Sequence, residues 1–210
     1  MIRILVADDH AVVREGIKQI LAGLEDMVVE DEAESGQDVL LKMSTKDYDL
    51  ILLDISMPGK SGLEILEEIK VVRPKLPVLI LSMHPEEQYA VRMLRAGASG
   101  YLTKASAPQE LISAIRKVSR GGKYVTVSLA EKLAFELDAG AQKPRHERLS
   151  NREYQVMLML ASGLSVSEVA EELCLSAKTI STYRTRILEK MDMKKNAELT
   201  LYAVKNNLIL

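Results

Sequence analysis

The stretch 50–54 reads LILLD, a short apolar run that ends at a carboxylate. Apolar residues without alternation are typical of a strand that is buried on both faces, as the strands of a parallel sheet are. Four similar runs lie elsewhere in the chain, at residues 2–7, 27–33, 77–81 and 98–102. The sequence therefore predicts five strands that share one parallel sheet.

Stretches with a helical period alternate with these runs, at residues 12–24, 37–43, 62–72, 86–96 and 108–118. Apolar residues that recur three and four positions apart form one buried face of a helix. The alternation predicts an α/β fold, a doubly wound five-stranded parallel sheet. With the strand order 2-1-3-4-5 that is expected for this topology, ligands bind beyond the carboxyl ends of the strands.

The alternation stops at Gly121-Gly122, and only helical patterns follow. We expect a first domain over residues 1–121 and a linker over 122–147, in which residues 128–137 have the period of a short helix. The linker ends in a polar stretch with Gly and Pro and no period, AGAQKPRHER. A small all-α domain is expected over residues 148–210.

Two capping boxes mark helix starts in the second domain, Ser150-x-x-Glu153 and Ser165-x-x-Glu168. In this motif the serine hydroxyl accepts a hydrogen bond from the third backbone N–H, and the glutamate accepts one from the backbone of the serine. Two further helices are expected to follow, the first of them beginning at Ser176.

Composition excludes several classes of protein. The chain has 210 residues, 47% hydrophobic and 28% charged, which is typical of a globular protein and not of a disordered or fibrous one. No apolar run reaches the roughly 18 residues of a membrane span, and residues 1–7 lead into acids without a signal-cleavage pattern. We therefore expect a cytoplasmic protein with no membrane contact. The single cysteine, Cys174, cannot form an internal disulfide, and we expect it to be buried beside Leu173 and Leu175.

The net charge of −2 is unevenly distributed: residues 1–144 sum to −4 and residues 145–210 to +2. The basic excess is concentrated in residues 178–195, which contain six Lys or Arg and two acids. Such a cluster on an otherwise acidic chain favours a polyanion as a partner, although a run of charges is more often a solvated face.

Three acids end two of the predicted strands, Asp8 and Asp9 after the first and Asp54 after the third. In the expected strand order these two strands are neighbours, so the three side chains meet. Three carboxylates repel one another unless a cation lies among them, and Mg²⁺ prefers such hard oxygen ligands. The cluster therefore predicts a Mg²⁺ site, with acids that only solvate a loop as the alternative.

Two further strand ends add a hydroxyl, Ser82, and an ammonium group, Lys104. A hydroxyl, an ammonium and a metal around one carboxylate can neutralise the three oxygens of a phosphoryl group placed on it. Catalysis of phosphoryl transfer consists largely of such positioning and charge stabilisation. The set as a whole therefore predicts phosphoryl transfer to Asp54.

These residues resemble the receiver domain of two-component response regulators, and the resemblance covers residues 1 to about 120. The motifs that carry it are Asp8-Asp9, Asp54-x-x-Met57-Pro58-Gly59, Ser82 and Lys104. The resemblance implies a flavodoxin-like fold and a sensor histidine kinase as the partner that phosphorylates Asp54. It implies no enzyme in the usual sense, because a receiver catalyses only its own phosphorylation and dephosphorylation.

Further roles follow from the same resemblance. Ser82 and Tyr101 would form a switch pair, in which the hydroxyl moves to the phosphate and the aromatic ring follows inward. The residues implied as holders of Mg²⁺ are Asp8, mainly through water, Asp9, Asp54 and the backbone carbonyl of Ser56.

The basic cluster falls on a predicted helix over residues 176–191. At about 100° per residue, Ile180, Ile187 and Met191 share one line and form a buried stripe. The rest of the surface carries small hydroxyls framed by long cations, which suits a helix in the major groove of DNA. The predicted DNA-binding residues are Lys178, Thr179, Ser181, Thr182, Tyr183, Arg184, Thr185, Arg186 and Lys190.

The surrounding motifs resemble the LuxR-type helix-turn-helix over nearly all of residues 149–210. The segments that carry this resemblance are 149–153 (LSNRE), 161–163 (ASG), 168–170 (EVA) and 175–180 (LSAKTI). A receiver followed by this module resembles the NarL/FixJ subfamily of response regulators. That resemblance implies binding of double-stranded promoter DNA and control of transcription, with RNA polymerase as a further candidate partner.

We expect a homodimer after phosphorylation, because one short helix reads few base pairs and a two-fold dimer doubles the contacts. In the second domain the apolar residues of the last helix are candidates for the contact between the two chains. These residues are Leu199, Leu201 and Val204.

Three other functions compete with this one. An aspartate-nucleophile phosphatase would need an acid two residues after the nucleophile, where this chain has Ser56. A LuxR-type regulator that senses a small molecule would enclose an apolar ligand, and the acid cluster argues against that. An adaptor that does not bind DNA is the third alternative, and a gel-shift experiment with genomic fragments discriminates it.

Overall fold

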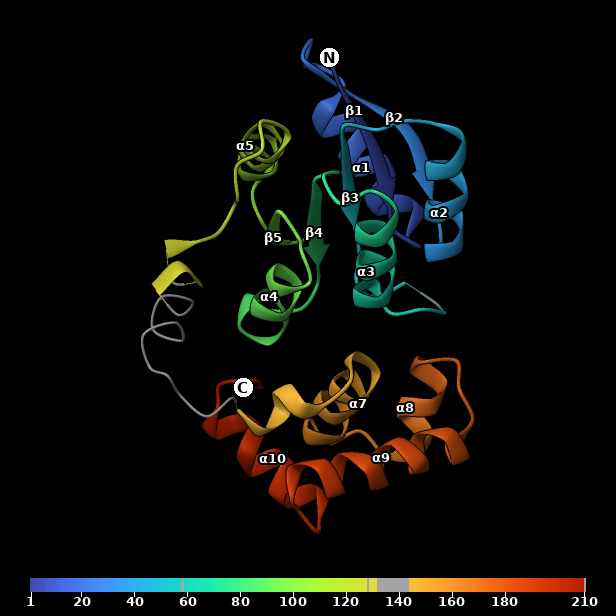
Figure 1. Cartoon of the computed structure of the whole chain (residues 1–210), viewed down its shortest axis with the longest axis vertical. Helices are drawn as coiled ribbons and strands as arrows, with labels where there is room; N and C mark the ends of the chain where they lie inside the picture. The colour runs from blue at the N-terminus through green and yellow to red at the C-terminus, as the bar shows by residue number, and fades with distance from the viewer. Residues whose placement is uncertain (58, 128, 132–143, 210) are drawn as a thin grey trace. The chain divides into compact units, whose positions relative to one another are not determined.

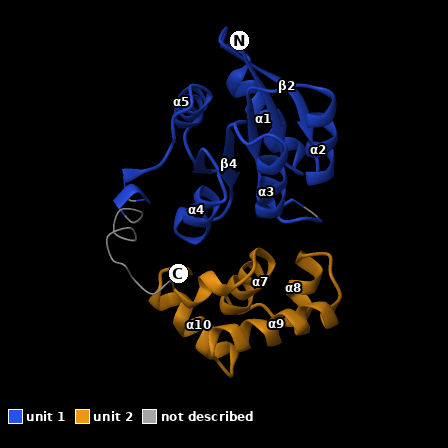
Figure 2. Ribbon diagram, in the orientation of Figure 1, with its two compact units in different colours: residues 1–133 blue, residues 134–210 orange. Residues whose placement is uncertain are grey.

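The computed structural model describes residues 1–57, 59–127, 129–131 and 144–209. It divides the chain into two compact units, unit 1 at residues 1–133 and unit 2 at residues 134–210 (Figure 2). The helix predicted over residues 128–137 lies mostly outside the described residues, although 129–131 are helical. No helix of the described part is long and apolar enough to cross a membrane.

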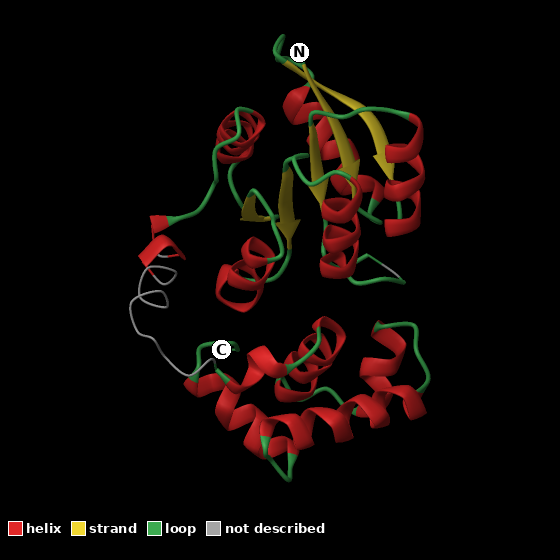
Figure 3. Cartoon of the chain, viewed as in Figure 1, coloured by secondary structure: helices red, strands yellow, loops and turns green. Residues whose placement is uncertain are grey.

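Unit 1 contains a five-stranded sheet in which all pairings are parallel (Figure 3). The strand order is β2-β1-β3-β4-β5, as predicted. Register follows the apolar runs; for example, Ile4 of β1 lies opposite Leu50 of β3, and both are fully buried. The strands are β1 (Ile2–Ala7), β2 (Met27–Ala33), β3 (Leu50–Leu53), β4 (Val78–Ser82) and β5 (Gly100–Thr103).

Helices cover both faces of this sheet (Figure 1). On one face, α1 and α5 pack on a core that includes Ile17, Leu111 and Ile115 together with alternate residues of the strands. On the other face lie α2 and α3, and α4 packs beside β5. The helices are α1 (Ala11–Leu21), α2 (Gly36–Thr45), α3 (Gly62–Val72), α4 (Glu86–Arg95) and α5 (Pro108–Ser119). The predicted doubly wound α/β fold is confirmed.

Unit 2 consists of helices in its described part. Both predicted capping boxes are present: the hydroxyls of Ser150 and Ser165 accept from the backbone N–H groups of Glu153 and Glu168. Ser176 caps the third helix, as predicted. The elements are η1 (Arg145–Arg148), α7 (Asn151–Ala161), α8 (Val166–Glu172), α9 (Ala177–Met191) and α10 (Asn196–Lys205).

Two predictions about unit 2 are wrong. Cys174 is exposed, because α8 ends at Glu172 and Cys174 lies in the following turn with a φ of +52°. Leu199 is fully buried in the core of unit 2 and cannot contact a second chain, whereas Leu201 and Val204 are exposed.

Candidate functional site

The carboxyl ends of β1 and β3 bring together the three predicted acids. Asp8 and Asp54 are each only 1% exposed, whereas Asp9 lies at the surface. Sheet hydrogen bonds continue into the acids and hold their backbone: the N–H of Asp54 donates to the carbonyl of Ala7 at 2.9 Å. One carboxylate oxygen of each acid and a ring nitrogen of His10 all lie within 4.8 Å of one another.

Lys104 extends from the end of β5 into this acid cluster. Its Nζ lies 2.6 Å from Oδ2 of Asp8 and 2.8 Å from Oδ2 of Asp54, and its side chain is 7% exposed. Burial raises the pKa of Asp54, and the Lys104 ammonium opposes that effect. Burial alone would lower the pKa of Lys104, but hydrogen bonds from its ammonium to Asp54 and Asp8 outweigh it and raise this pKa. The ammonium therefore lies beside two buried carboxylates and offsets part of their negative charge.

The donor set fits Mg²⁺. Oδ2 of Asp8 is buried and, apart from its contact with Nζ of Lys104 at 2.6 Å, accepts no hydrogen bond from the described residues, so a lone pair is left for a second cation. Carboxylate oxygens of Asp9 and Asp54 lie beside it, and hard oxygens of this kind suit Mg²⁺. Ser56 lies in the loop after β3, where its N–H donates to Oδ1 of Asp54 at 3.2 Å.

His10 was not foreseen as part of this cluster, although it directly follows the acids in the sequence. Its Nδ1 lies 2.8 Å from Oδ1 of Asp9 and 3.3 Å from Oδ1 of Asp8, and the ring is 66% exposed. The imidazole therefore borders the acid cluster on its solvent side.

Ser82 and Tyr101 both hydrogen-bond to the backbone of His84, in the short turn after β4. Ser82 ends β4, is fully buried, and accepts at Oγ from the N–H of His84 at 3.0 Å. The hydroxyl of Tyr101 donates to the carbonyl of the same His84 at 2.9 Å. Burial raises the pKa of Tyr101, so its hydroxyl stays protonated at neutral pH. The turn thus links the two residues that the resemblance implies as a switch pair.

The loop that carries Asp54 is held by the start of α3. A third capping box, Ser61 with Glu64, begins this helix. A Cβ at Gly62 would lie 2.3 Å from the Cα of Ile55, so only glycine lets the helix approach the residue that follows Asp54 this closely. The spacing Ser61-x-x-Glu64 is the signal that could have predicted this cap.

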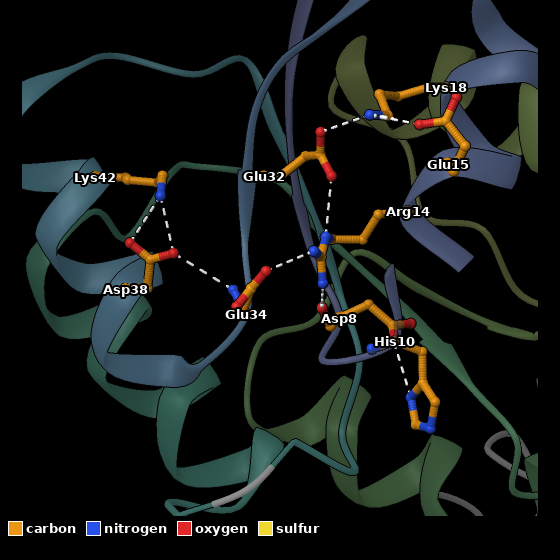
Figure 4. A network of polar contacts seen from close by, with 9 residues as sticks. All are labelled: Asp8, His10, Arg14, Glu15, Lys18, Glu32, Glu34, Asp38 and Lys42. Atoms are coloured by element: carbon orange, nitrogen blue, oxygen red, sulfur yellow. Dashed lines mark hydrogen bonds and ion pairs between the residues drawn. The ribbon is translucent and has the colours of Figure 1, made fainter. Parts of the chain in front are cut away.

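A buried arginine, Arg14 of α1, binds the backbone at Asp8 and two acids at the end of β2 and just after it (Figure 4). Its Nη1 donates to the backbone carbonyl of Asp8 at 2.7 Å, its Nε to Glu32 at 3.0 Å, and its Nη2 to Glu34 at 2.7 Å. Lys18 continues the network by contacting Glu32 at 2.8 Å. The guanidinium therefore fixes the Asp8 backbone to β2 and to the turn that follows it.

Replacing Arg14 by Met should lower the free energy of unfolding of unit 1 by about 2–3 kcal/mol, because it leaves a buried carbonyl without its donor and Glu32 with fewer partners. The matched control is Arg116→Met, which removes an exposed arginine that pairs with Asp26. That control should cost below about 1 kcal/mol. Urea unfolding of both variants gives the comparison, and equal losses would contradict a special role for Arg14.

In unit 2, α9 has the two faces that were predicted. Ile180, Ile187 and Met191 are fully buried, and Leu188 joins them. Some predicted DNA-binding side chains are bonded within their own helix: Thr182 donates to the carbonyl of Lys178 at 3.0 Å, and Thr185 donates to that of Ser181 at 3.1 Å. The exposed members of the set are Lys178, Ser181, Thr182, Thr185, Arg186 and Lys190, and the half-buried members are Thr179, Tyr183 and Arg184.

Two of the predicted cations have partners inside unit 2. Nζ of Lys190 lies 2.6 Å from Oε2 of Glu153, whose side chain is only 4% exposed. Nε of Arg184 donates to Oδ1 of Asn196 at 2.7 Å. These contacts tie α9 to the start of α7 and to α10. Burial alone would raise the pKa of Glu153, but hydrogen bonds from Lys190 and from Ser150 outweigh it and lower this pKa.

A glutamate with a lowered pKa stabilises the fold above its ordinary value of 4.5, and this contribution is lost as the pH falls through the lowered folded-state pKa. Glu153→Gln should keep the helix cap but lose the ion pair, which lowers the stability of unit 2 at pH 7 by about 1–2 kcal/mol and flattens its acid dependence. The control is Glu168→Gln, which changes the corresponding glutamate of the second capping box, a residue with no lysine partner in the described part of the chain. Thermal unfolding between pH 3 and 7 measures both, and an unchanged pH profile for Glu153→Gln would refute the ion-pair contribution.

The fold and the acid–lysine cluster of unit 1, followed by the capped helices of unit 2, define a receiver joined to a helix-turn-helix module. Comparison with protein families agrees. The family described as response regulator receiver domain matches residues 4–116, and the family of bacterial regulatory proteins, luxR family, matches residues 147–203. The chain belongs to the response regulators of the NarL/FixJ type, which join a receiver to a LuxR-type DNA-binding domain. Both resemblances drawn from the sequence motifs are confirmed.

Similar proteins cover the whole length of the chain. The response regulator GacA of Pseudomonas protegens is 38% identical, over 100% of this chain and 98% of that protein. A structure of the response regulator RcsB of Salmonella typhimurium is 27% identical, with a TM-score of 0.72, and covers 100% of this chain and 98% of its own. RcsB of Salmonella enterica serovar Typhimurium, bound to promoter rprA with the phosphomimetic BeF3⁻, is 28% identical with a TM-score of 0.66, over 97% and 99% of the two chains.

Proposed function

We propose that a sensor histidine kinase phosphorylates this response regulator on Asp54, and that the phosphorylated protein binds promoter DNA through α9. The observation that carries the first step is the position of Asp54, buried at the carboxyl edge of the sheet with the Lys104 ammonium 2.8 Å from its Oδ2. An aspartate in this position has a nucleophilic carboxylate beside a positive charge that is already placed to stabilise phosphoryl oxygens.

In the proposed step a carboxylate oxygen of Asp54 attacks the phosphorus of a phosphohistidine; the phosphorus–nitrogen bond breaks and an aspartyl phosphate forms. Lys104 then contacts a phosphoryl oxygen in place of Oδ2, and the Ser82 hydroxyl donates to another. Mg²⁺, held by Asp9, Asp54, the Ser56 carbonyl and, through water, Asp8, would supply positive charge that offsets the phosphoryl oxygens. The His84 turn, which contacts both Ser82 and Tyr101, would transmit the change to the surface.

The same proposal covers domain limits and partners. We assign the receiver to residues 1–121, the linker to 122–147 and the DNA-binding domain to 148–210. The receiver would catalyse only its own phosphorylation and dephosphorylation. Phosphorylation would favour a homodimer, and RNA polymerase is a further candidate partner. A protein that is phosphorylated by a sensor kinase and then binds DNA would be located in the cytoplasm.

Incubation with a small phosphodonor and Mg²⁺ should add one phosphoryl group to the wild-type chain and none to Asp54→Asn, because Asp54 directly follows the strand between β1 and β4 and lies 2.8 Å from the Lys104 ammonium. Asp49→Asn, which changes an exposed acid just before β3, should be labelled like the wild type. Intact-protein mass spectrometry before and after treatment with base counts the phosphoryl groups. Labelling of Asp54→Asn at the wild-type level would exclude the assignment.

The exposed face of α9 supports the second step. Long cations at its edges suit phosphates, and the short side chains between them let the helix backbone approach base edges. Of the predicted cations, Lys178 and Arg186 are exposed and have no ion pair within the described residues, whereas Lys190 is paired with Glu153. We therefore expect the first two to contribute most to phosphate contacts.

Lys178→Gln should weaken binding to all DNA sequences alike and lower the salt slope by about one unit. Thr182→Ala should instead change which sequence is preferred, with a cost of roughly 1–3 kcal/mol at the affected base pair. Titration of both variants against a panel of operator variants at two salt concentrations separates the effects. If Thr182→Ala weakens every site equally, another surface reads the bases.

A further inference from the structure

A cavity lies in unit 1 at the edge of the sheet opposite to the acid cluster. It has a volume of about 450 Å³ and is formed by the segments that lead into β4 and β5 and by the residues after α5. In a parallel sheet the amino ends of the strands point away from the carboxyl ends, where Asp54, Ser82 and Lys104 lie. The cavity is therefore separate from the proposed phosphorylation site.

The lining of this cavity carries positive charge without a carboxylate. Lys70, Lys75, Arg95 and Lys123 line it, and no acid does so among the described residues. Nζ of Lys70 donates to the carbonyl of Leu76 at 2.6 Å, and Nζ of Lys123 donates to that of Ala98 at 2.6 Å. These two ammonium groups thus have neutral carbonyls as partners, and their mutual repulsion is not offset by an acid of the lining.

This repulsion affects the pKa of the half-buried Lys70. Burial, together with the nearby charge of Lys123, lowers the pKa of Lys70 to about 8. Gathering like charges around a recess costs stability, and an anion bound there would remove that cost. An anion from outside the chain could therefore act as the counter-ion of Lys70 and Lys123.

The lining of the cavity also includes an uncharged hydroxyl donor and a glycine that keeps the cavity open. Ser99 is 8% exposed and lines the cavity, and its hydroxyl makes no hydrogen bond within the described part of the chain. Gly97 has a φ of +105°, and a Cβ there would lie 3.2 Å from Cγ of Lys70. Glycine at this position therefore lets the Lys70 stem lie against the turn and leaves the cavity open.

We propose that this basic cavity, lined by Lys70, Lys75, Lys123 and Ser99, binds a small solute that carries a diphosphate group. The volume falls within the range of about 300–1,000 Å³ that is usual for small-ligand sites. Ammonium groups and a hydroxyl donor are suitable partners for phosphate oxygens, and three or more cations match the two to three negative charges of a diphosphate.

Binding would also fix the beginning of the segment that leaves the receiver. Lys123 contributes to the cavity, and the next residue, Tyr124, donates its N–H to the carbonyl of Ser99 at 2.8 Å. A bound diphosphate would therefore hold residues 121–124 against the sheet. This effect does not require phosphorylation of Asp54.

The test is a titration of the full-length, ¹⁵N-labelled chain with pyrophosphate, at constant ionic strength and with EDTA to remove Mg²⁺. Saturable shifts are expected at the backbone amides of Gly97, Ser99, Gly121 and Lys123. Orthophosphate should bind at least tenfold more weakly. Adenosine diphosphate then identifies the source: equal or tighter binding points to a nucleotide, and weaker binding points to free pyrophosphate.

The variant Lys75→Gln/Lys123→Gln changes two exposed residues, so the fold should persist while pyrophosphate affinity falls at least tenfold. The matched control Lys194→Gln/Lys195→Gln removes the same charge from unit 2 and should leave the affinity unchanged. Asp54→Asn should also bind normally, which keeps this test independent of the phosphorylation proposal. Shifts confined to α9 or to the acid cluster, or an unchanged affinity of the first variant, would overturn the proposal.

Discussion

Two carboxylates buried at the ends of neighbouring strands impose the main constraint on unit 1. Asp8 and Asp54 are each 1% exposed, and burial of charge is costly unless partners compensate for it. Lys104 supplies one positive charge from β5, while Arg14 and Gly62 hold the backbone on either side. The topology of the sheet therefore holds these two carboxylates close together. The proposed phosphoryl transfer depends on the same arrangement.

Unit 2 also contains a nearly buried carboxylate, and one ion pair neutralises it. Glu153 caps α7 and is nearly buried, and Lys190 of α9 neutralises it. The residue that balances this charge belongs to the helix whose other face is proposed to meet DNA. The orientation of that helix is thus set by an electrostatic contact as well as by its apolar stripe.

The strands and the buried stripe of α9 could be predicted because each leaves a periodic or continuous apolar pattern in the sequence, and the strand order followed from the topology expected for alternating strands and helices. The acid cluster followed from the rule that parallel strands end at one edge. Contacts between distant residues left no such pattern: Arg14 meets Glu32 and Glu34, and Lys190 meets Glu153 37 positions away. Cys174 was misplaced because its left-handed turn carries no glycine as a signal.

The order β2-β1-β3-β4-β5 leaves two strands with a free side, and each is protected against pairing with another chain. β2 carries Glu30, Asp31 and Glu32 in succession, and charged side chains on an edge strand disfavour pairing with another chain. β5 has only four residues, and Tyr124 forms a parallel bridge with its Gly100. Both edges therefore disfavour the extension of this sheet by a strand of a second copy.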